Sequence, residues 1–321
     1  MSEAKTSIIR SGAGCLSTGA LITRLKKEKV RVIGLDCNPM SAGFHLVDTG
    51  YVVPRGDEPG FLDEVVRICE TEKPDAMISG PEEELLVLSK NKALLEERGV
   101  LLLCPDFDTV RICADKLETH HKLSSYAVPT PQIYQIEEAK FPCIIKPRFG
   151  RGGRDIYKAN DREELAFFLP KVSQPVVQEF VAGTEYTVDV FADLAGNPLS
   201  IVPRIRLQVE SGISVKGVTV FDEEIISYCR RIAESLKLIG PSCIQCLKTD
   251  ERLVFIEINT RFGGGSALSM EADPTIVPNL VRMARREPPV PSRGFKQGLV
   301  MLRYYNEVFT TQDTAVTGET R

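Results

Sequence analysis

The 321-residue sequence contains no tryptophan and only three histidines, His45, His120 and His121. None of the three stands at the spacing of a zinc site, so we expect packing or surface roles for them. Long apolar runs are missing too, which excludes a membrane-spanning helix. The 40 basic and 44 acidic residues leave a formal charge of −4, so bulk charge gives no reason to expect a nucleic acid. We therefore expect neither a membrane nor a nucleic acid as partner.

The first residues lack the basic flank and apolar core of a signal peptide, so a cytoplasmic protein is expected. The nine cysteines are scattered and odd in number, which favours free thiols over a disulfide framework. Cys243 and Cys246 have a CxxC spacing, but their segment reads as a strand. An odd separation on a strand places the two side chains on opposite faces, so both are expected to be inert core residues.

Residues 1–105 alternate short apolar strands with amphipathic helices, which predicts an open parallel sheet with right-handed crossovers. The predicted strands are residues 7–10, 30–36, 75–79 and 100–104. The predicted helices are residues 18–27, 61–69 and 82–95.

Beyond Pro105 the pattern becomes mixed. Prolines 129 and 131 forbid a helix, so the chain there is expected to be extended. Predicted helices are 106–113, 115–126, 163–168 and 221–238, and a loop followed by a helix is expected within 266–285. Predicted strands lie within 141–157 and 176–193, at 198–207, 242–249 and 252–258, and as a pair within 296–309. Residues 310–321 are expected to form a loose tail.

The segment FIEINTRFGGG predicts a metal site. Alternate residues of a strand share a face, so Glu257 and Asn259 point one way while Ile256 and Ile258 point into the other layer. Gln245 carries a further oxygen on the preceding strand of the same hairpin. Such oxygens are hard ligands that suit Mg²⁺.

Two further segments indicate nucleotide binding. In IIKPRFGRGGRD, Lys146 ends an apolar strand and precedes a glycine-rich loop, whose backbone N–H groups can converge on phosphate oxygens. In VVQEFVAGTEYTV, the polar Gln178 and Glu179 stand at a junction of two strands, where they can meet an adenine edge. Glu185 follows and can accept from ribose hydroxyls. A hydrophobic wall around the ring is expected from Ile144, Val181 and Phe255.

The order of these motifs resembles the ATP-grasp superfamily. Four motifs follow one another along the chain: an Asp115-Lys116 helix start, a lysine–glycine-loop hairpin, a QEFxxGxE linker and a Q…ExN hairpin. Arg261 follows the last of them. The closest likeness is to the ATP-grasp modules of carbamoyl phosphate synthase large chain and their small stand-alone relatives. The resemblance implies a Rossmann-like domain at 1–105 and a two-lobed ATP-grasp fold at 106–309, with a small nucleotide-clamping lobe at about 127–182.

The resemblance also implies roles for single residues. Lys116 and Lys146 would contact the nucleotide phosphates, and Arg261 would steady the transferred phosphate, with Lys216 as a further γ-phosphate contact. The metal ligands would be Gln245, Glu257 and Asn259. ATP and Mg²⁺ are the implied cofactors, with Mn²⁺ as a substitute. The remaining implied nucleotide contacts are the loop glycines Gly150, Gly152 and Gly153, the adenine hinge Gln178, Glu179 and Val181, and the ribose acceptor Glu185.

The implied reaction is ATP-dependent ligation. A carboxylate becomes an acyl phosphate and passes to an amine or similar nucleophile, with release of ADP and phosphate. Arg204 and Arg206 are candidates for binding the acidic substrate. The partners would then be a small acid and a small nucleophile, and a homodimer is left open.

Three alternatives remain. One is phosphorylation of bicarbonate or carbamate as in carbamoyl phosphate synthase, although a single grasp module weighs against it. Another is an ATP-binding regulatory module without turnover, which the complete Q, E, N and R set disfavours. The third is an NAD-dependent oxidoreductase, suggested by Gly12, Gly14 and Asp36, but position 17 is serine where the third glycine is needed. The glycine loop at residues 12–14 is instead expected to line the acceptor pocket.

Overall fold

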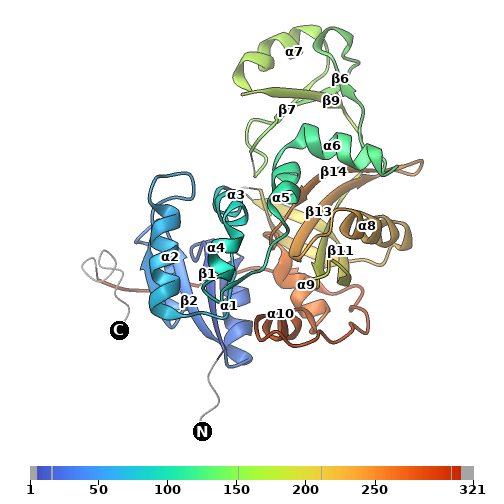
Figure 1. The fold of residues 1–321 in the computed structure, drawn as a ribbon. Coiled ribbons are helices and arrows are strands. Elements are labelled where there is room, and N and C mark those ends of the chain that lie inside the picture. The colour runs from blue at the N-terminus through green and yellow to red at the C-terminus, as the bar shows by residue number, and fades with distance from the viewer. Residues whose placement is uncertain (1–5, 16, 151, 211, 305, 312–321) are drawn as a thin grey trace.

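A computed structural model describes residues 6–15, 17–150, 152–210, 212–304 and 306–311. These residues form three β-sheets with helices around them (Figure 1). The N-terminal sheet is parallel throughout, whereas the six-stranded and four-stranded sheets that follow are built from antiparallel pairs. The expected sequence of an α/β part followed by an α+β part is therefore confirmed.

The N-terminal sheet has the strand order β3-β2-β1-β4-β5. Its central strand β1 is buried along its whole length, as in sheets with both faces covered. Because the chain leaves β1 toward one edge and returns at β4 toward the other, the carboxyl ends of β1 and β4 flank a topological switch point. The strands are β1 (Ser7–Ser11), β2 (Arg31–Asp36), β3 (Thr49–Val52), β4 (Ala76–Ile78) and β5 (Leu101–Leu102), and the helices are α1 (Thr18–Lys27), α2 (Phe61–Glu72), α3 (Glu82–Lys90) and α4 (Lys92–Glu96).

Two elements of this region differ from the expectation. The edge strand β3 was not predicted, because its four residues include a glycine and show no alternation. The single helix expected at 82–95 is two helices, α3 and α4, which are separated at Asn91. The Asn91 side chain donates to the carbonyl oxygen of Val87, a local bond of the kind that competes with helix continuation.

The six-stranded sheet has the order β14-β13-β10-β11-β12-β15. One of its faces packs against α8, where Val188, Ile244, Phe255 and Ile258 join the apolar side of the helix. The other face is polar and is turned toward the cavity described below. The elements are β10 (Thr184–Ala192), β11 (Pro198–Glu210), β12 (Ile213–Thr219), α8 (Glu223–Ser235), β13 (Gly240–Lys248), β14 (Leu253–Asn259) and β15 (Val300–Leu302).

The four-stranded sheet, in the order β6-β9-β7-β8, has a small core of its own beneath α7. In Figure 1 this sheet and α7 form one end of the molecule, above α6 and β14. The elements are β6 (Ile133–Tyr134), β7 (Cys143–Pro147), β8 (Tyr157–Ala159), α7 (Arg162–Phe168) and β9 (Pro175–Glu179). The helices α5 (Phe107–Ala114) and α6 (Lys116–Ser125) lead into it.

The C-terminal helices return to the N-terminal sheet. Leu280 and Met283 of α10 (Ile276–Ala284) share one apolar core with Leu21 of α1 and Ile8 of β1. The preceding helix α9 (Ser266–Ala272) occupies a segment where a loop was expected. The strand pair expected at 296–309 is a single strand, β15, within the described residues. Of the expected tail at 310–321, residues 312–321 lie outside the described part of the chain.

Within the described ranges, no helix combines the length and the apolar character that crossing a bilayer requires.

Candidate nucleotide and metal site

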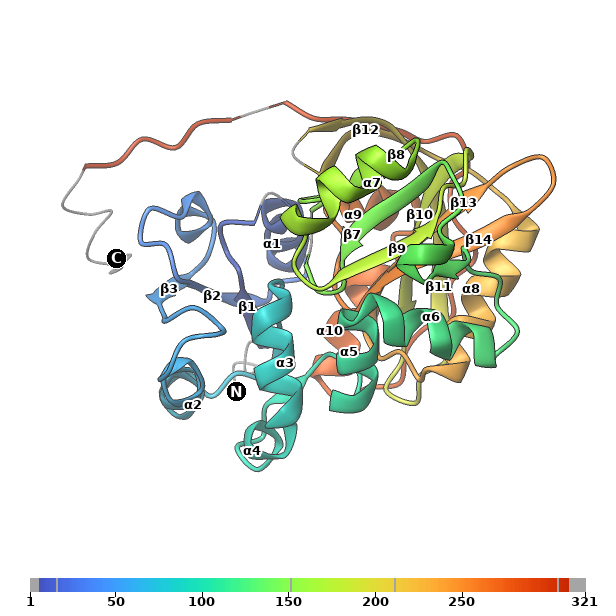
Figure 2. The same cartoon turned by 90° about the horizontal axis from the view of Figure 1, so that it is seen from above.

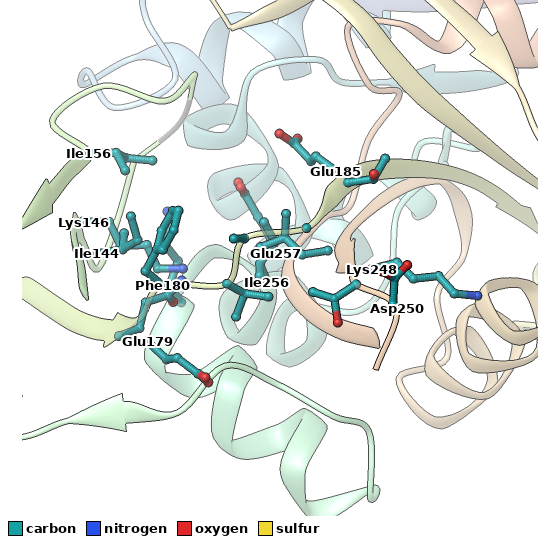
Figure 3. A pocket seen from close by; sticks show the side chains of 18 residues that line it. Ile144, Lys146, Ile156, Glu179, Phe180, Glu185, Lys248, Asp250, Ile256 and Glu257 are labelled. Atoms are coloured by element: carbon teal, nitrogen blue, oxygen red, sulfur yellow. The ribbon is translucent and has the colours of Figure 1, made fainter. Parts of the chain in front are cut away.

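A cavity of about 790 Å³ lies between the four-stranded and six-stranded sheets (Figure 3). Its walls come from β7, β9, the linker into β10, the end of β13 and β14, and the start of α6. Seven residues that the sequence analysis predicted for nucleotide or metal binding line it together: Lys116, Lys146, Gln178, Glu179, Val181, Glu185 and Glu257. These residues span about 140 positions of sequence, so only the fold brings them together.

Lys116 and Lys146 reach the cavity from different directions. Lys146 ends β7 and is only 6% exposed, whereas Lys116 is the first residue of α6. Burial lowers the pKa of Lys146 to about 8; the nearby Glu257 carboxylate acts to raise it, and the Lys116 charge acts to lower it further. Two cations and one carboxylate therefore share one partly desolvated space.

The glycine-rich loop is anchored to the start of α6. Asp115 caps α6 by accepting from the backbone N–H groups of Leu117 and Glu118, and it also binds Arg148 with an N–O distance of 2.6 Å. Lys116 then donates to the carbonyl oxygen of Gly150 at 2.8 Å. The loop itself needs glycine, because positions 152 and 153 have φ values of +71° and +70°.

The predicted adenine hinge lies between β9 and β10. Gln178 and Val181 are buried at 7% exposure each and line the cavity. The Glu179 carboxylate accepts a hydrogen bond from Arg252, so its side chain is neutralised at the rim. Gly183 follows, and a side chain there would stand 2.7 Å from the carbonyl oxygen of Lys248, which explains the glycine.

The apolar wall corrects one expectation. Ile144 and Val181 line the cavity as predicted, but Ile256 takes the place expected for Phe255. A β-bulge in the β13–β14 pairing sets Gln245 opposite Glu257 and Cys246 opposite Phe255, which leaves Ile256 as the extra residue. Ile256 therefore faces the cavity beside Glu257 rather than the other layer, while Phe255 packs into the core against Tyr228.

The three predicted metal ligands share one sheet face. Gln245 is paired with Glu257, and Cys243, two residues before Gln245, is paired with Asn259. Directly opposed residues of antiparallel strands lie on the same face, so Gln245 and Asn259 share the sheet face of Glu257, which is the one of the three that lines the cavity. Two amide oxygens and a carboxylate form a donor set of the kind that Mg²⁺ prefers, and the residues present therefore fit such an ion.

Arg261 stands between this site and the N-terminal sheet. It donates from Nη2 to Asn259 Oδ1 at 3.2 Å and from Nη1 to the carbonyl oxygen of Phe262 at 3.2 Å. Its charge also acts on Arg10, Cys15 and Glu82 of the N-terminal part. The predicted phosphate-steadying arginine therefore lies near enough to the switch point of the parallel sheet for its charge to act there.

Glu82 was not predicted as a site residue. It is the first residue of α3, directly after the carboxyl end of β4, and α3 packs beside α5 (Figure 2). Desolvation raises the pKa of Glu82, and the charges of Arg261 and Lys116 act to lower it. In sequence it looked like the first of three solvated helix carboxylates, and no local signal separates it from Glu83.

Glu84, two residues further, holds this turn in place. It is 5% exposed and accepts from the hydroxyls of Ser79, at 2.9 Å, and Ser11. Burial raises the pKa of Glu84 to about 7. Because Ser11 and Ser79 end β1 and follow β4, this clamp fixes the first turn of α3 over the switch point.

Three predicted substrate or phosphate contacts do not line the cavity. Lys216 is exposed on β12 and is not among the residues that line the cavity. Arg204 is 2% exposed and donates from Nε to Asp189 at 2.8 Å, beneath the glycines that follow Arg261. Arg206 donates to the Glu185 carboxylate at 2.8 Å. A phosphate contact for Lys216 stays a prediction, whereas Arg204 forms a buried ion pair with Asp189.

The cysteines and the N-terminal glycine loop behave as structural features. Cys243 and Cys246 are free, and burial raises the pKa of each to about 12. No group of three potential metal-binding His, Cys, Asp or Glu side chains occurs in the described ranges. Asp36, the last residue of β2, accepts from the backbone N–H of Gly14 at 2.7 Å and of Asn38 at 2.9 Å, so both oxygens of the carboxylate that a dinucleotide ribose would need are engaged. This contact further disfavours the NAD alternative.

Comparison with known proteins matches this arrangement. A family model described as ATP-grasp domain matches residues 113–265, and one described as PylC-like, N-terminal domain matches residues 13–103. The carbamoyl phosphate synthase large chain of Clostridium perfringens is 24% identical over 269 residues, which cover 75% of this chain and 24% of that protein. The chain thus spans about a quarter of the length of that relative.

Two solved structures show the same fold. The biotin carboxylase domain dimer of Hydrogenobacter thermophilus 2-oxoglutarate carboxylase, in complex with MgADP, ADP and bicarbonate, superposes with a TM-score of 0.73 at 15% identity. The match covers 93% of this chain and 74% of that one. An L-amino acid ligase from Bacillus licheniformis gives a TM-score of 0.70 at 19% identity, over 91% of this chain and 76% of that one.

The fold and the cavity thus define a protein with the ATP-grasp architecture. The chain belongs to the ATP-grasp superfamily, and its N-terminal part matches the PylC-like domain.

Proposed function

We propose that this chain is an ATP-dependent, ADP-forming ligase. It phosphorylates a carboxylate to an acyl phosphate and transfers the acyl group to an amine or similar nucleophile. The observation that carries the proposal is the meeting of Lys116, Lys146 and Glu257 in one cavity, which the predicted adenine hinge and an apolar wall also line. The division at about residue 105, with a small lobe at 127–182, belongs to the same proposal.

The lining of the cavity suggests how a nucleotide would be oriented in it. Its apolar end is built from Ile144, Val181, Leu247 and Ile256, where a purine ring would be buried. Its charged end holds the two lysines and Glu257, where a triphosphate with Mg²⁺ would lie. The Glu185 carboxylate lines the same cavity and is the proposed ribose acceptor. ATP in complex with Mg²⁺ is therefore the proposed cofactor, with Mn²⁺ as a substitute.

Phosphoryl transfer needs alignment and positive charge more than covalent help from the protein. Lys116, Lys146 and Arg261 would supply that charge, and Glu257 and Asn259 would hold a Mg²⁺ that adds further positive charge at the phosphates. The glycine-rich loop would cover the intermediate and keep water from hydrolysing it. The acceptor would approach from the switch point, where the Arg261 charge acts on Glu82.

One alternative has its own support. Carbamoyl phosphate synthase large chains are among the relatives, which favours phosphorylation of bicarbonate or carbamate in the same site. The L-amino acid ligase and the carboxylase domain share the fold with this chain, so fold alone does not choose between a carboxylate and bicarbonate.

The test is ADP release by the purified chain with a panel of carboxylic acids, each with and without amines, and with bicarbonate alone. Mass spectrometry identifies the product. A ligase releases ADP only with one acid and forms a condensation product, whereas bicarbonate-dependent release without condensation supports the alternative. Nucleotide binding without turnover under every condition would contradict both.

The metal assignment needs a matched control. We expect Glu257→Ala with Asn259→Ala to lower Mg²⁺-dependent turnover by about 10³-fold or more, because positioned charge provides most of the stabilisation in phosphoryl transfer. The matched control is Glu251→Ala. Glu251 lies on the exposed turn of the same hairpin, so this variant should keep wild-type turnover. Wild-type turnover in the double variant would show that the metal lies elsewhere.

The dimeric carboxylase domain supports a homodimer as the proposed assembly. Light scattering should then give twice the chain mass of 35.6 kDa.

A further inference from the structure

One oxygen of Glu185 joins two strands of the polar sheet face. Glu185 Oε1 accepts from Arg206 Nη1 at 2.8 Å and from Gln245 Nε2 at 3.0 Å. The Glu185 side chain is 38% exposed, and that of Arg206 is 14% exposed, so the ion pair is shielded on the arginine side. Both bonds use Oε1, so neither engages the second carboxylate oxygen of Glu185, a residue that lines the cavity (Figure 3).

The bond from Gln245 decides which end of its amide can meet a metal. A glutamine side chain presents an N–H₂ donor and a carbonyl acceptor on opposite sides, and only the carbonyl can bind a cation. With Nε2 held by Glu185, the carbonyl oxygen turns away from β10. Glu257 lies on that other side, opposite Gln245 in the β13–β14 pairing. Glu185 thus orients a predicted metal ligand without touching the metal itself.

Arg206 holds Glu185 in the position that this orientation requires. Its second nitrogen, Nη2, donates to the carbonyl oxygen of Gly212 at 2.7 Å, so the guanidinium is fixed on both sides. A planar fork with two separated donors can make both bonds at once, whereas a lysine ammonium is a single point of charge. The arginine also compensates the Glu185 charge, which would otherwise repel a triphosphate in the same cavity.

From this geometry we infer that Arg206 is a positioning residue that couples nucleoside binding to metal binding through Glu185 and Gln245. The inference rests on the nucleotide and metal sites of the proposed function. A ribose hydroxyl bound to the second oxygen of Glu185 would restrict the motion of that carboxylate. The carboxylate would in turn hold the Gln245 amide with its carbonyl oxygen toward the metal. By linkage, each ligand then raises the affinity of the other by the same factor.

The test uses ligands that do not bind each other. Adenosine has no phosphate to chelate a metal, so any effect on Mn²⁺ affinity must pass through the protein. Mn²⁺ is titrated into the full chain, with electron paramagnetic resonance to measure the free ion, in the absence and presence of saturating adenosine. We expect adenosine to raise Mn²⁺ affinity about five- to tenfold in the wild type, the lower range of measured couplings.

The Arg206→Met variant should lose this coupling, with a ratio of affinities near one, and Arg206→Lys should restore only part of it. The matched control is Arg252→Met, because Arg252 also pairs with a carboxylate of the cavity, that of Glu179, but the bonds described for Glu179 reach no metal ligand. This control should weaken adenosine binding and keep the wild-type coupling factor.

Several outcomes would overturn the inference. These are an unchanged coupling factor in Arg206→Met, a loss of coupling in Arg252→Met, or no coupling in the wild type. If thermal melting shows that Arg206→Met does not fold, Glu185→Gln tests the same link, because a neutral amide cannot retain the ionic anchor. Failure of the ligase proposal looks different: ADP release would be absent while the adenosine–Mn²⁺ coupling persisted.

Discussion

Lys116 Nζ donates to the carbonyl oxygen of Gly150 at 2.8 Å, so a cation predicted to bind phosphate is held by the loop predicted to cover it. The same loop is tied at its base to Asp115, one residue before Lys116, through Arg148. The start of α6 and the glycine-rich loop therefore form one unit at the charged end of the cavity.

Replacing Lys116 by methionine should lower kcat/KM for ATP by about 10²-fold, because it removes a positive charge from the phosphate end and a bond to the loop. Steady-state kinetics of ADP release will measure this. Lys122→Met is the control, since Lys122 lies on the same helix with its ammonium over the Tyr126 ring, and its kinetics should stay at wild type. Equal losses in both variants would point to a general defect of α6.

Nucleotide affinity should depend on pH through Lys146. The pKa of this lysine is about 8 in the protein without ligand, since burial disfavours its charged form. A bound triphosphate favours the charged form and raises that pKa. Affinity should therefore be constant below about pH 8, fall as pH rises above it, and be accompanied by proton uptake.

Calorimetric titrations of the protein with ADP, in buffers of different ionisation enthalpy, will measure the number of protons taken up on binding. The Lys146→Arg variant stays charged at all these pH values and should bind with no such pH dependence. A pH-independent affinity in the wild type between pH 7 and 9 would show that Lys146 does not meet the phosphates.

Glu82 should act on the acceptor rather than on ATP. It belongs to the N-terminal part, the Arg261 charge acts on it, and a clamp at Glu84 fixes its turn. In Glu82→Gln we expect the KM for an amine acceptor to rise about tenfold, equivalent to the loss of one hydrogen bond to a charged group, with the KM for ATP unchanged. Glu83→Gln, on the same turn, is the comparison, and parallel changes in both variants would argue against a specific contact.

The Arg204–Asp189 pair should matter for stability. Arg204 is 2% and Asp189 is 6% exposed, and Asp189 also accepts from the Ser269 hydroxyl at 2.5 Å. Arg204→Met leaves a buried carboxylate without its cation, which should lower the free energy of unfolding by about 3–5 kcal/mol. Urea denaturation will measure it. A loss under about 1 kcal/mol would mean that Asp189 finds another partner or becomes protonated.

Much of the fold follows from local patterns. The helices at 18–27 and 61–72 and the strands at 31–36 and 253–259 show clear periodicity, because each buries one regular face. The strand β3 and the break at Asn91 escaped prediction, since a short edge strand and a one-residue interruption leave little periodic signal. The face of the strand on which Ile256 lies was predicted wrongly for a related reason. A bulge adds one residue to the strand, and simple alternation then assigns the side chain to the wrong face.

The sequence by itself determined the residue types of the site: lysines beside glycines, a polar hinge, and amide and carboxylate oxygens on one hairpin. Their chemistry is local, so short motifs suffice to identify them. Only the tertiary structure decided which of them meet in one cavity, that Glu185 holds Gln245 and Arg206 at once, and that the Arg261 charge acts on Glu82. Those relationships depend on strand register and sheet packing across distant segments, and no single segment of the chain encodes them.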